Sequence, residues 1–459
     1  MIEEKNEKLD GILPINEELL RKLLIEENID EFRKHFLIHH AYERAQFYEK
    51  VGPDIRRIMY NFLSPEEMAE IYEAIELDEE EVEDFIKEMD PAYAAEMLSY
   101  MYTDDVVDVL NELDEEHRDT FLEMMDEETA EEISELLGYE EYTAGSIMTT
   151  EYVSIQENST VKSAMNVLRH EAPDAETIYY VFVVDEMHRL TGVMSLRDLI
   201  VADEDALIRD IMSERVVYAK VTDDQEKIAQ IFKDYDFLAC PVVDENGILQ
   251  GIITVDDIID VIDEEASDDY SKLAGISDVD DVGDNPFKAA KQRLPWLVML
   301  LFLGMITASL MGQFEETLER VALLALFIPL ISGTSGNSGT QALAVVVRGI
   351  ATGEIDEKSK FKMVFREMGT GLITGLVCGI VVVGIVYFWK SSLIVGLLVG
   401  TAICCSIFVA TIAGSLIPLL IHKLGIDPAA ASGPFITTLN DITSILIYLG
   451  LATLLLGQL

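Results

Sequence analysis

GVMSLRD at residues 192–198 and GIITVDD at residues 251–257 decide the fold of the middle of this chain. Both have the order Gly, two apolar residues, Ser or Thr, two further residues and Asp, and each closes a β-branched run before a helical pattern. This order predicts a strand that leads directly into a helix. SIM at 146–148 and DIM at 210–212 recur in the same way. The recurrence is an internal repeat, and it predicts two α/β modules.

The strands expected in these modules are short runs of apolar and β-branched residues. They lie at residues 179–184 and 190–194 in the first repeat, and at 240–243 and 248–253 in the second. The two-fold strand–G-h-h-[ST]-x-x-D–helix pattern resembles a tandem pair of CBS modules.

The residues before the repeat predict an all-helical domain. Apolar residues recur at helical spacing, as at Met68, Ile71 and Ile75. Helix starts are marked by a capping residue before proline or acidic residues, as at Ser64 and Asp90. Similar segments of about a dozen residues follow one another, which predicts a small helical superhelix.

The charge of the chain is concentrated in its first part. Of 33 Lys and Arg and 85 Asp and Glu, 11 and 9 lie from residue 288 onwards, which leaves 22 bases and 76 acids in residues 1–287. Such a surface repels nucleic acid and anionic lipid headgroups, so nucleic acid is excluded as a partner. A merely solubilising acidic surface is the simplest alternative interpretation.

The last part of the chain predicts a membrane domain that crosses the lipid bilayer five times. Uncharged stretches cover residues 294–314, 321–347, 368–389, 391–422 and 428–459, the last interrupted only by Asp441. Each is long enough to cross about 30 Å of hydrocarbon. Lys and Arg are concentrated between the second and third stretches, which places the N-terminus in the cytosol. The charged first ten residues predict no cleaved signal peptide.

Together these patterns predict a multi-pass protein of the cell (inner) membrane with four parts. The expected parts are an all-α superhelical N-domain at 1–140, an α/β tandem pair at 141–262 (about 141–204 and 205–262), a connecting helix at 263–292 and a polytopic α-helical pore domain at 293–459.

Asp441 is the residue of the membrane part that most clearly indicates function. An ionised carboxylate near the middle of a span costs a few kcal/mol, so it is seldom kept without a role. Asn337 and Thr340 lie in the polar stretch GTSGNSGTQ at 333–341 of the second span, and Asn440 precedes Asp441. Hydroxyls, amides and a carboxylate suit a hydrated hard cation such as Mg2+. The alternative is an Asp that only hydrogen-bonds a neighbouring helix.

The order of acidic helical domain, paired CBS modules, acidic connecting helix and five spans resembles the MgtE magnesium channels along the whole chain. Local matches are APDAETIYY at 172–180, SLRDLIVAD at 195–203 and the stretch from Asp427 to Asp441. The resemblance implies a homodimer with its pore at the dimer axis and Asp441 as the selectivity carboxylate, with Asn337, Asp427 and Asn440 in the pore region. The family motif usually has a second Asn where this chain has Thr340, which leaves the ion preference open.

The resemblance also implies that Mg2+ binds between the N-domain, the CBS modules and the connecting helix, called the plug helix. The matching positions are Asp104, Asp108, Glu226, Asp236, Asp257, Asp260, Glu265, Asp268 and Asp269. Mg2+ that bridges facing carboxylates would hold a compact, closed form, and repulsion would separate the domains when Mg2+ falls.

A nucleotide is the second ligand that the CBS resemblance implies, with ATP as the expected adenine nucleotide. Ser195 and Asp198 would hold the ribose hydroxyls, Arg197 would lie near phosphate and Tyr180 beside the base. The alternative is an empty cleft that serves only as a hinge. The equivalent Asp257 of the second repeat is expected to be committed to Mg2+.

Four alternative functions share features with this sequence. A chloride channel places its CBS pair after the membrane part and needs more spans, and a CorA-type channel needs a Gly-Met-Asn signature, whereas Gly304 and Met305 are followed by Ile306. A membrane-tethered sensor of cations or nucleotides does not require a mid-membrane Asp. A channel for other divalent cations such as Co2+ stays open as an alternative. No hydrolytic constellation is present, so no enzyme is expected.

Overall fold

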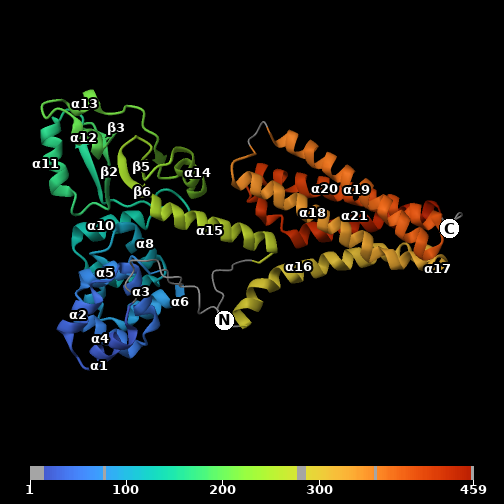
Figure 1. Ribbon diagram of the computed structural model, residues 1–459, viewed down its shortest axis with the longest axis horizontal. Helices are drawn as coiled ribbons and strands as arrows, with labels where there is room; N and C mark the ends of the chain where they lie inside the picture. The colour runs from blue at the N-terminus through green and yellow to red at the C-terminus, as the bar shows by residue number, and fades with distance from the viewer. Residues whose placement is uncertain (1–14, 76–78, 277–285, 356–358, 456–459) are drawn as a thin grey trace. The chain divides into compact units, whose positions relative to one another are not determined.

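The computed structural model describes residues 15–75, 79–276, 286–355 and 359–455 (Figure 1). The chain divides into two compact units, residues 1–262 and 263–459, and each is described by itself. The polar stretch 277–285, which the sequence places before the first span, lies outside the described residues.

The first unit begins with the predicted helical domain. Ser64 caps α5 through a capping box with Glu67, and Asp90 caps α7, so both predicted helix starts are confirmed. Its apolar core continues into the second α/β module through Ala144 and Met148. In the part of this domain that the structure describes, the helices are α1 (Glu17–Ile25), α2 (Ile29–Phe36), α3 (Ala41–Lys50), α4 (Pro53–Phe62), α5 (Pro65–Tyr72), α6 (Glu79–Glu88), α7 (Pro91–Leu98), α8 (Thr103–Asn111), α9 (Glu115–Met124) and α10 (Glu127–Leu136).

The two repeats fold into two α/β modules of the same topology. In the first, β2 (Thr177–Val184) lies between β1 (Tyr152–Gln156) and β3 (Leu190–Ser195), parallel to β1 and antiparallel to β3. In the second, β5 (Ala239–Val243) lies in the same way between β4 (Ala219–Lys220) and β6 (Leu249–Thr254). The helices are α11 (Val161–Glu171), α12 (Leu196–Val201), α13 (Ile208–Ile211) and α14 (Gln225–Tyr235). The four predicted strands are confirmed, whereas β1 and β4 were not predicted.

In each repeat, the segment before the first strand forms a backbone bridge with a strand of the other repeat. Thr149 forms an antiparallel bridge with Ile252, and Ser213 forms one with Val193. A Cβ at Gly251 would lie 2.5 Å from the carbonyl oxygen of Thr149, and a Cβ at Gly192 would lie 2.5 Å from the sulfur of Met212. The glycine of each motif is therefore required by the close approach of the other repeat's segment.

Helix α15 (Val255–Ala274) begins directly after β6 in the first unit and ends in the second. Its first turn contains Asp256 and Asp257, and its last turns contain Asp268, Asp269 and Lys272. Part of the connecting helix predicted at 263–292 is therefore continuous with the second α/β module.

The described residues of the second unit contain five long helices, in agreement with the five predicted spans. They are α16 (Pro286–Gly312), α18 (Ile328–Ala351), α19 (Lys360–Lys390), α20 (Leu393–Lys423) and α21 (Gly433–Leu454), with the short α17 (Glu315–Arg320), η1 (Ala322–Phe327) and η2 (Pro428–Ala430) between them. Among the described residues, four of these helices are long and apolar enough to cross a membrane. The fifth, α18, falls short because GTSGNSGTQ lies within it, and residues 322–327 at the start of the predicted second span form a 3-10 helix instead.

Helices α18 and α21 run antiparallel and pack closely with α20. A Cβ at Gly336 would lie 2.8 Å from Thr437 Cγ2, and a Cβ at Gly414 would lie 2.2 Å from the carbonyl oxygen of Gly339. Small residues therefore allow the backbones of three helices to approach one another around the polar part of α18.

Candidate functional site

The first candidate site lies where α18 and α21 face each other. Asp441 of α21 is partly exposed, and its carboxylate accepts a hydrogen bond from the hydroxyl of Ser332 on α18. Further along the same helix pair, the hydroxyls of Thr340 and Thr437 lie 3.2 Å apart. The structure therefore places Asp441 and Thr340 along one seam between the two helices.

The remaining predicted pore residues lie on different faces. Asn337 is exposed on α18, in a stripe that also contains the exposed Gly333 and Gln341. Asn440 is fully buried between α18, α20 and α21, and among the described residues its amide nitrogen and oxygen have no hydrogen-bond partner. Asp427 caps η2 through the backbone N–H of Ala429 at 2.8 Å.

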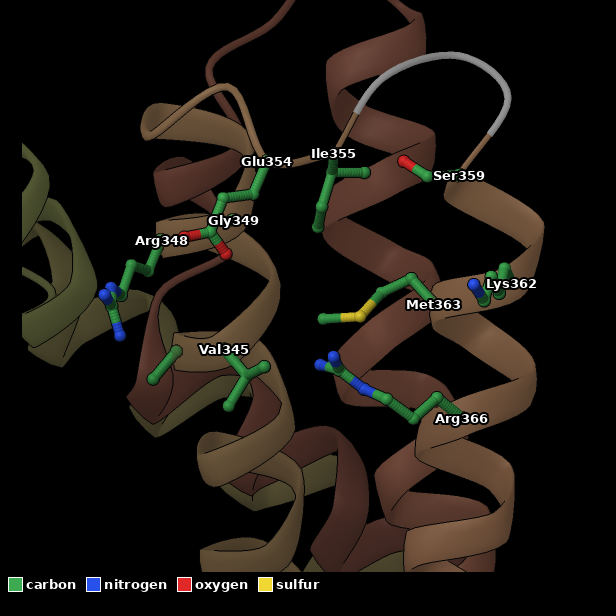
Figure 2. Close-up of a pocket in the computed structure, with 10 residues that line it drawn as sticks. Val345, Arg348, Gly349, Glu354, Ile355, Ser359, Lys362, Met363 and Arg366 are labelled. Atoms are coloured by element: carbon green, nitrogen blue, oxygen red, sulfur yellow. The ribbon is translucent and has the colours of Figure 1, made fainter.

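A cavity of about 690 Å³ lies between one end of α18 and the start of α19 (Figure 2). Figure 2 shows the side chains of Met363 and Arg366 pointing from α19 toward α18, while Arg348 points to the other side of α18. The lining has three cations, Arg348, Lys362 and Arg366, against one acid, Glu354. Because these cations repel Mg2+, this cavity is not a candidate cation site.

The second candidate site is a group of acids in the first unit. Carboxylate oxygens of Glu176, Asp256 and Asp257 all lie within 4.8 Å of one another. Asp257 is oriented by Thr254, whose hydroxyl donates to Asp257 Oδ2 at 2.6 Å. One oxygen of Glu176 is buried without a hydrogen-bond partner among the described residues. Three converging carboxylates with an unpartnered buried oxygen fit a hard divalent cation.

Burial and mutual repulsion raise the pKa of the acids around this group. The pKa of Glu176 rises to about 8, chiefly through burial and also through the charge of Asp257. The pKa of Asp257 rises to about 6, again chiefly through burial. On α8, burial and the same Asp257 raise the pKa of Asp104 well above its usual value and that of Asp105 to about 8. Each charge in this group therefore makes the next ionisation harder.

The other predicted metal positions of the first unit lie at the surface. Asp108 is exposed on α8, and its charge contributes to the raised pKa of Asp105. Glu226 and Asp236 are exposed at the two ends of α14, and Asp260 is exposed one turn after Asp256 on α15. Of the predicted set, Asp104 and Asp257 lie close enough for the charge of Asp257 to raise the pKa of Asp104.

The predicted acids of the plug helix lie at the end of α15. Glu265, Asp268 and Asp269 are partly exposed. The ammonium of Lys272 contacts Asp268 and lies 2.6 Å from Asp427 Oδ2. Burial raises the pKa of Asp269 to about 6, with a further contribution from Asp427. The end of α15 and the segment before α21 therefore share one group of charges.

The predicted nucleotide residues gather where β3 meets α12. The hydroxyl of Ser195 donates to Asp198 Oδ2 at 2.6 Å in a capping box, and Tyr180 is paired with Ser195 across the sheet. Arg197 and Asp198 are exposed. The hydrogen bond from Ser195 lowers the pKa of Asp198, the opposite of the shift at Asp257. The same motif thus gives an exposed, ionised Asp in one repeat and a partly buried Asp among other acids in the second.

Several residues of these sites were not predicted from the sequence. Glu176 and Asp256 complete the acidic group, Ser332 binds Asp441, and Lys272 binds Asp427. Glu176 lies within the stretch 172–180 that resembles the family, but the resemblance assigned no role to Glu176.

Comparisons with known proteins cover nearly the whole chain. Residues 328–451 match a family model described as a divalent cation transporter, residues 39–142 match the MgtE intracellular N domain, and residues 144–205 and 208–264 match CBS domains. The magnesium transporter MgtE of Enterococcus faecalis is 53% identical over 95% of this chain and 96% of its own length. The Thermus thermophilus protein of that name is 43% identical over 77% of this chain and 79% of its own length.

Two solved structures resemble the first part of the chain. The soluble part of a magnesium transporter is 54% identical, covers 55% of this chain and 98% of that one, and has a TM-score of 0.53. The cytosolic domain of the Mg2+ channel MgtE in complex with ATP is 38% identical, covers 53% of this chain and 99% of that one, and has a TM-score of 0.51. The resemblance drawn from the sequence is thus confirmed, including the expectation of a transporter and not an enzyme. This chain, with its cytosolic N-terminal domain and several membrane-spanning helices, belongs to the MgtE family of magnesium transporters.

Proposed function

We propose that this chain is a Mg2+-selective channel that takes up magnesium across the cell (inner) membrane and is closed by cytosolic Mg2+. The observation that supports this most strongly is Asp441, a partly exposed carboxylate in the apolar α21 that is held by Ser332. The Ser332 hydroxyl supplies a neutral oxygen beside it, and Mg2+ is commonly held through its waters by one or two carboxylates. The similarity to proteins named magnesium transporters supports the same ion.

The channel is proposed to be a homodimer with its pore at the dimer axis. Gly333, Asn337 and Gln341 form an exposed polar stripe on α18, and polar groups in contact with lipid are unfavourable. A second copy placed against this stripe would cover it and line an aqueous path. The two copies would then supply two Asp441 carboxylates to one ion.

Closure is proposed to depend on the acidic group of the first unit. Without a divalent cation, Glu176, Asp256 and Asp257 repel one another at the distances observed. A bound Mg2+ would bridge them and stabilise the compact arrangement of α8, the α/β modules and α15. When cytosolic Mg2+ falls, repulsion would loosen this arrangement and release α15, which continues into the membrane unit.

ATP is proposed to bind at the first repeat and to modulate closure. The exposed Asp198 carboxylate, ordered by Ser195, is available to ribose hydroxyls, and Arg197 is available to phosphate. A relative's cytosolic domain was crystallised with ATP, which supports this ligand class. Asp257, in contrast, is surrounded by acids that would repel phosphate.

Mg2+ flux into proteoliposomes containing the full chain tests the pore assignment. We expect selective Mg2+ flux that is lost in Asp441→Ala while the assembled protein is retained. Glu367→Gln is a matched control, because Glu367 is also a carboxylate of the membrane unit but is paired with Arg366 and not with Ser332. Unchanged, Mg2+-preferring flux in Asp441→Ala would rule out the pore assignment, and preference for Co2+ in the wild type would favour the alternative ion.

A further inference from the structure

Lys272 supplies an internal cation to two carboxylates in the second unit. Its Nζ donates to Asp427 Oδ2 at 2.6 Å, across 155 residues of sequence, and it also contacts Asp268 one turn earlier on α15. Asp268 had been expected to bind Mg2+, and Asp427 to lie in the pore region. In this structure both are neutralised by an ammonium group that belongs to the chain itself.

The end of α15 fits closely on the segment before α21, so this ion pair is not an isolated surface contact. Leu273 packs against the apolar cluster that contains Ala429 and Ile436. A Cβ on Gly275, which has φ +74°, would lie 3.4 Å from Pro434 Cγ. In the same segment, the backbone N–H of Ala429 fixes the other oxygen of Asp427. The geometry therefore presents Asp427 to Lys272 in a defined orientation.

Lys272 is also the main positive charge that offsets the neighbouring carboxylates of Asp268, Asp269 and Asp427. Burial alone would lower the pKa of its ammonium, but hydrogen bonds to Asp268 and Asp427 outweigh burial and raise the pKa overall. The neighbouring Asp269 is repelled by Asp427 and attracted by Lys272. Removal of the ammonium would leave three carboxylates facing one another at the start of the α21 segment, which would favour separation of α15 or binding of another cation.

We propose that Lys272 is an internal cation that takes the place of a Mg2+ ion at Asp427 and so ties the end of α15 to the pore segment in the closed form. The proposal rests on the channel function and closure mechanism proposed above. α21 begins six residues after Asp427 and contains Asp441, so Asp427 lies at one end of the helix that lines the proposed path. With Lys272 at Asp427, this contact forms without a Mg2+ ion, so the end of α15 is held at lower Mg2+ than the carboxylates alone would allow. Without the ammonium, Asp268, Asp269 and Asp427 repel one another, and more Mg2+ is needed to hold α15 in the closed form.

The test measures Mg2+ flux of the full chain in proteoliposomes while the Mg2+ concentration on the cytosolic side is varied. Lys272→Met should raise the Mg2+ concentration at which half of the flux is lost (half-closure). We expect an increase of about fivefold or more, because fivefold is the lower end of the range for two coupled binding sites. Lys272→Arg keeps a cation and should restore most of the wild-type response. Lys423→Met removes another lysine close to Asp427 in sequence and should leave half-closure unchanged.

A double-mutant cycle decides whether Lys272 acts through Asp427. Asp427→Asn alone should weaken closure, and its combination with Lys272→Met should be no worse than the more severe single change. Additive effects, or a Lys272→Met channel that closes at the wild-type Mg2+ concentration, would overturn the proposal. Because every variant here must still conduct Mg2+, a wild type without Mg2+ flux would instead refute the proposed function itself.

Discussion

Replacement of Asp257 by Asn is a sharp test of the acidic group, because the structure predicts that its effect on stability changes sign with Mg2+. The carboxylates of Asp257, Glu176 and Asp256 approach within 4.8 Å. Two unit charges at that distance repel by about 3 kcal/mol at an effective dielectric constant of about 20. Asn retains an acceptor oxygen for Thr254, so the cap of α15 is kept while the charge is removed.

The magnitude follows from the ionisation of the neighbours. With a pKa of about 8, Glu176 is half ionised at pH 8, and the exposed Asp256 is screened by solvent. In chelator at pH 8, Asp257→Asn should therefore stabilise the fold by about 1–2 kcal/mol, or about 2–8 °C in melting temperature. Saturating Mg2+ should stabilise the wild type by about 2.7 kcal/mol at a hundredfold excess over its Kd. Most of this stabilisation by Mg2+ should be lost in Asp257→Asn.

Thermal unfolding of residues 1–275, with and without Mg2+, measures both effects. Asp198→Asn is the matched control, because it changes the same capping box in the first repeat, where the Asp is exposed. The Asp198→Asn variant should have nearly the wild-type melting temperature in chelator. Mg2+ should stabilise this variant as much as it stabilises the wild type. If Asp257→Asn is less stable than the wild type in chelator and gains as much from Mg2+, the acidic group is not a Mg2+ site.

Three further predictions concern protons, the plug helix and nucleotide. Because folding raises the pKa of Glu176 to about 8, the compact form binds protons more tightly than the unfolded chain, so in chelator stability should fall as pH rises from about 6 to about 8. Mg2+ should flatten that dependence, and a profile that is equally steep with Mg2+ would refute it. Neutralising Glu265, Asp268 and Asp269 together should leave the channel open in flux assays at cytosolic Mg2+ levels that close the wild type; an identical Mg2+ response would exclude these acids as sensors. ATP should bind more tightly with Mg2+ than without, by the factor by which ATP lowers the Mg2+ needed for closure. Calorimetry on residues 1–275, with Asp198→Ala as control, checks this, and equal ATP affinity at zero and saturating Mg2+ would show that the sites are uncoupled.

The fold was predictable wherever one residue pattern forces one local structure. The repeated motif at 192–198 and 251–257 predicted β3 and β6 because a strand that enters a helix needs that order of apolar and capping residues. Strand β4 was missed because it has only two residues and exists through pairing with β5. Likewise, nothing local indicates that residues 322–327 form a 3-10 helix, since an apolar run fits several conformations.

The sites were predictable where a residue type is costly in its surroundings. Asp441 stands out in an apolar span on energetic grounds alone. Glu176 does not stand out, because one more acid in an acidic chain becomes distinctive only when folding buries it beside Asp257. Lys272 is similarly inconspicuous, since its partner Asp427 lies 155 residues away. Pairings of this kind depend on tertiary packing, which no local pattern encodes.

The most direct measurement of the central claim is Mg2+ flux through the full-length wild-type protein in proteoliposomes, with the Mg2+ concentration on the side of the cytosolic domain set before the flux begins. We expect Mg2+-selective flux when that concentration is low and progressive closure as it rises, with the closed state reached at lower Mg2+ when ATP is present. Flux that is the same at low and high cytosolic Mg2+ would contradict closure by the acidic domains, and the absence of Mg2+ flux under both conditions would contradict the channel itself.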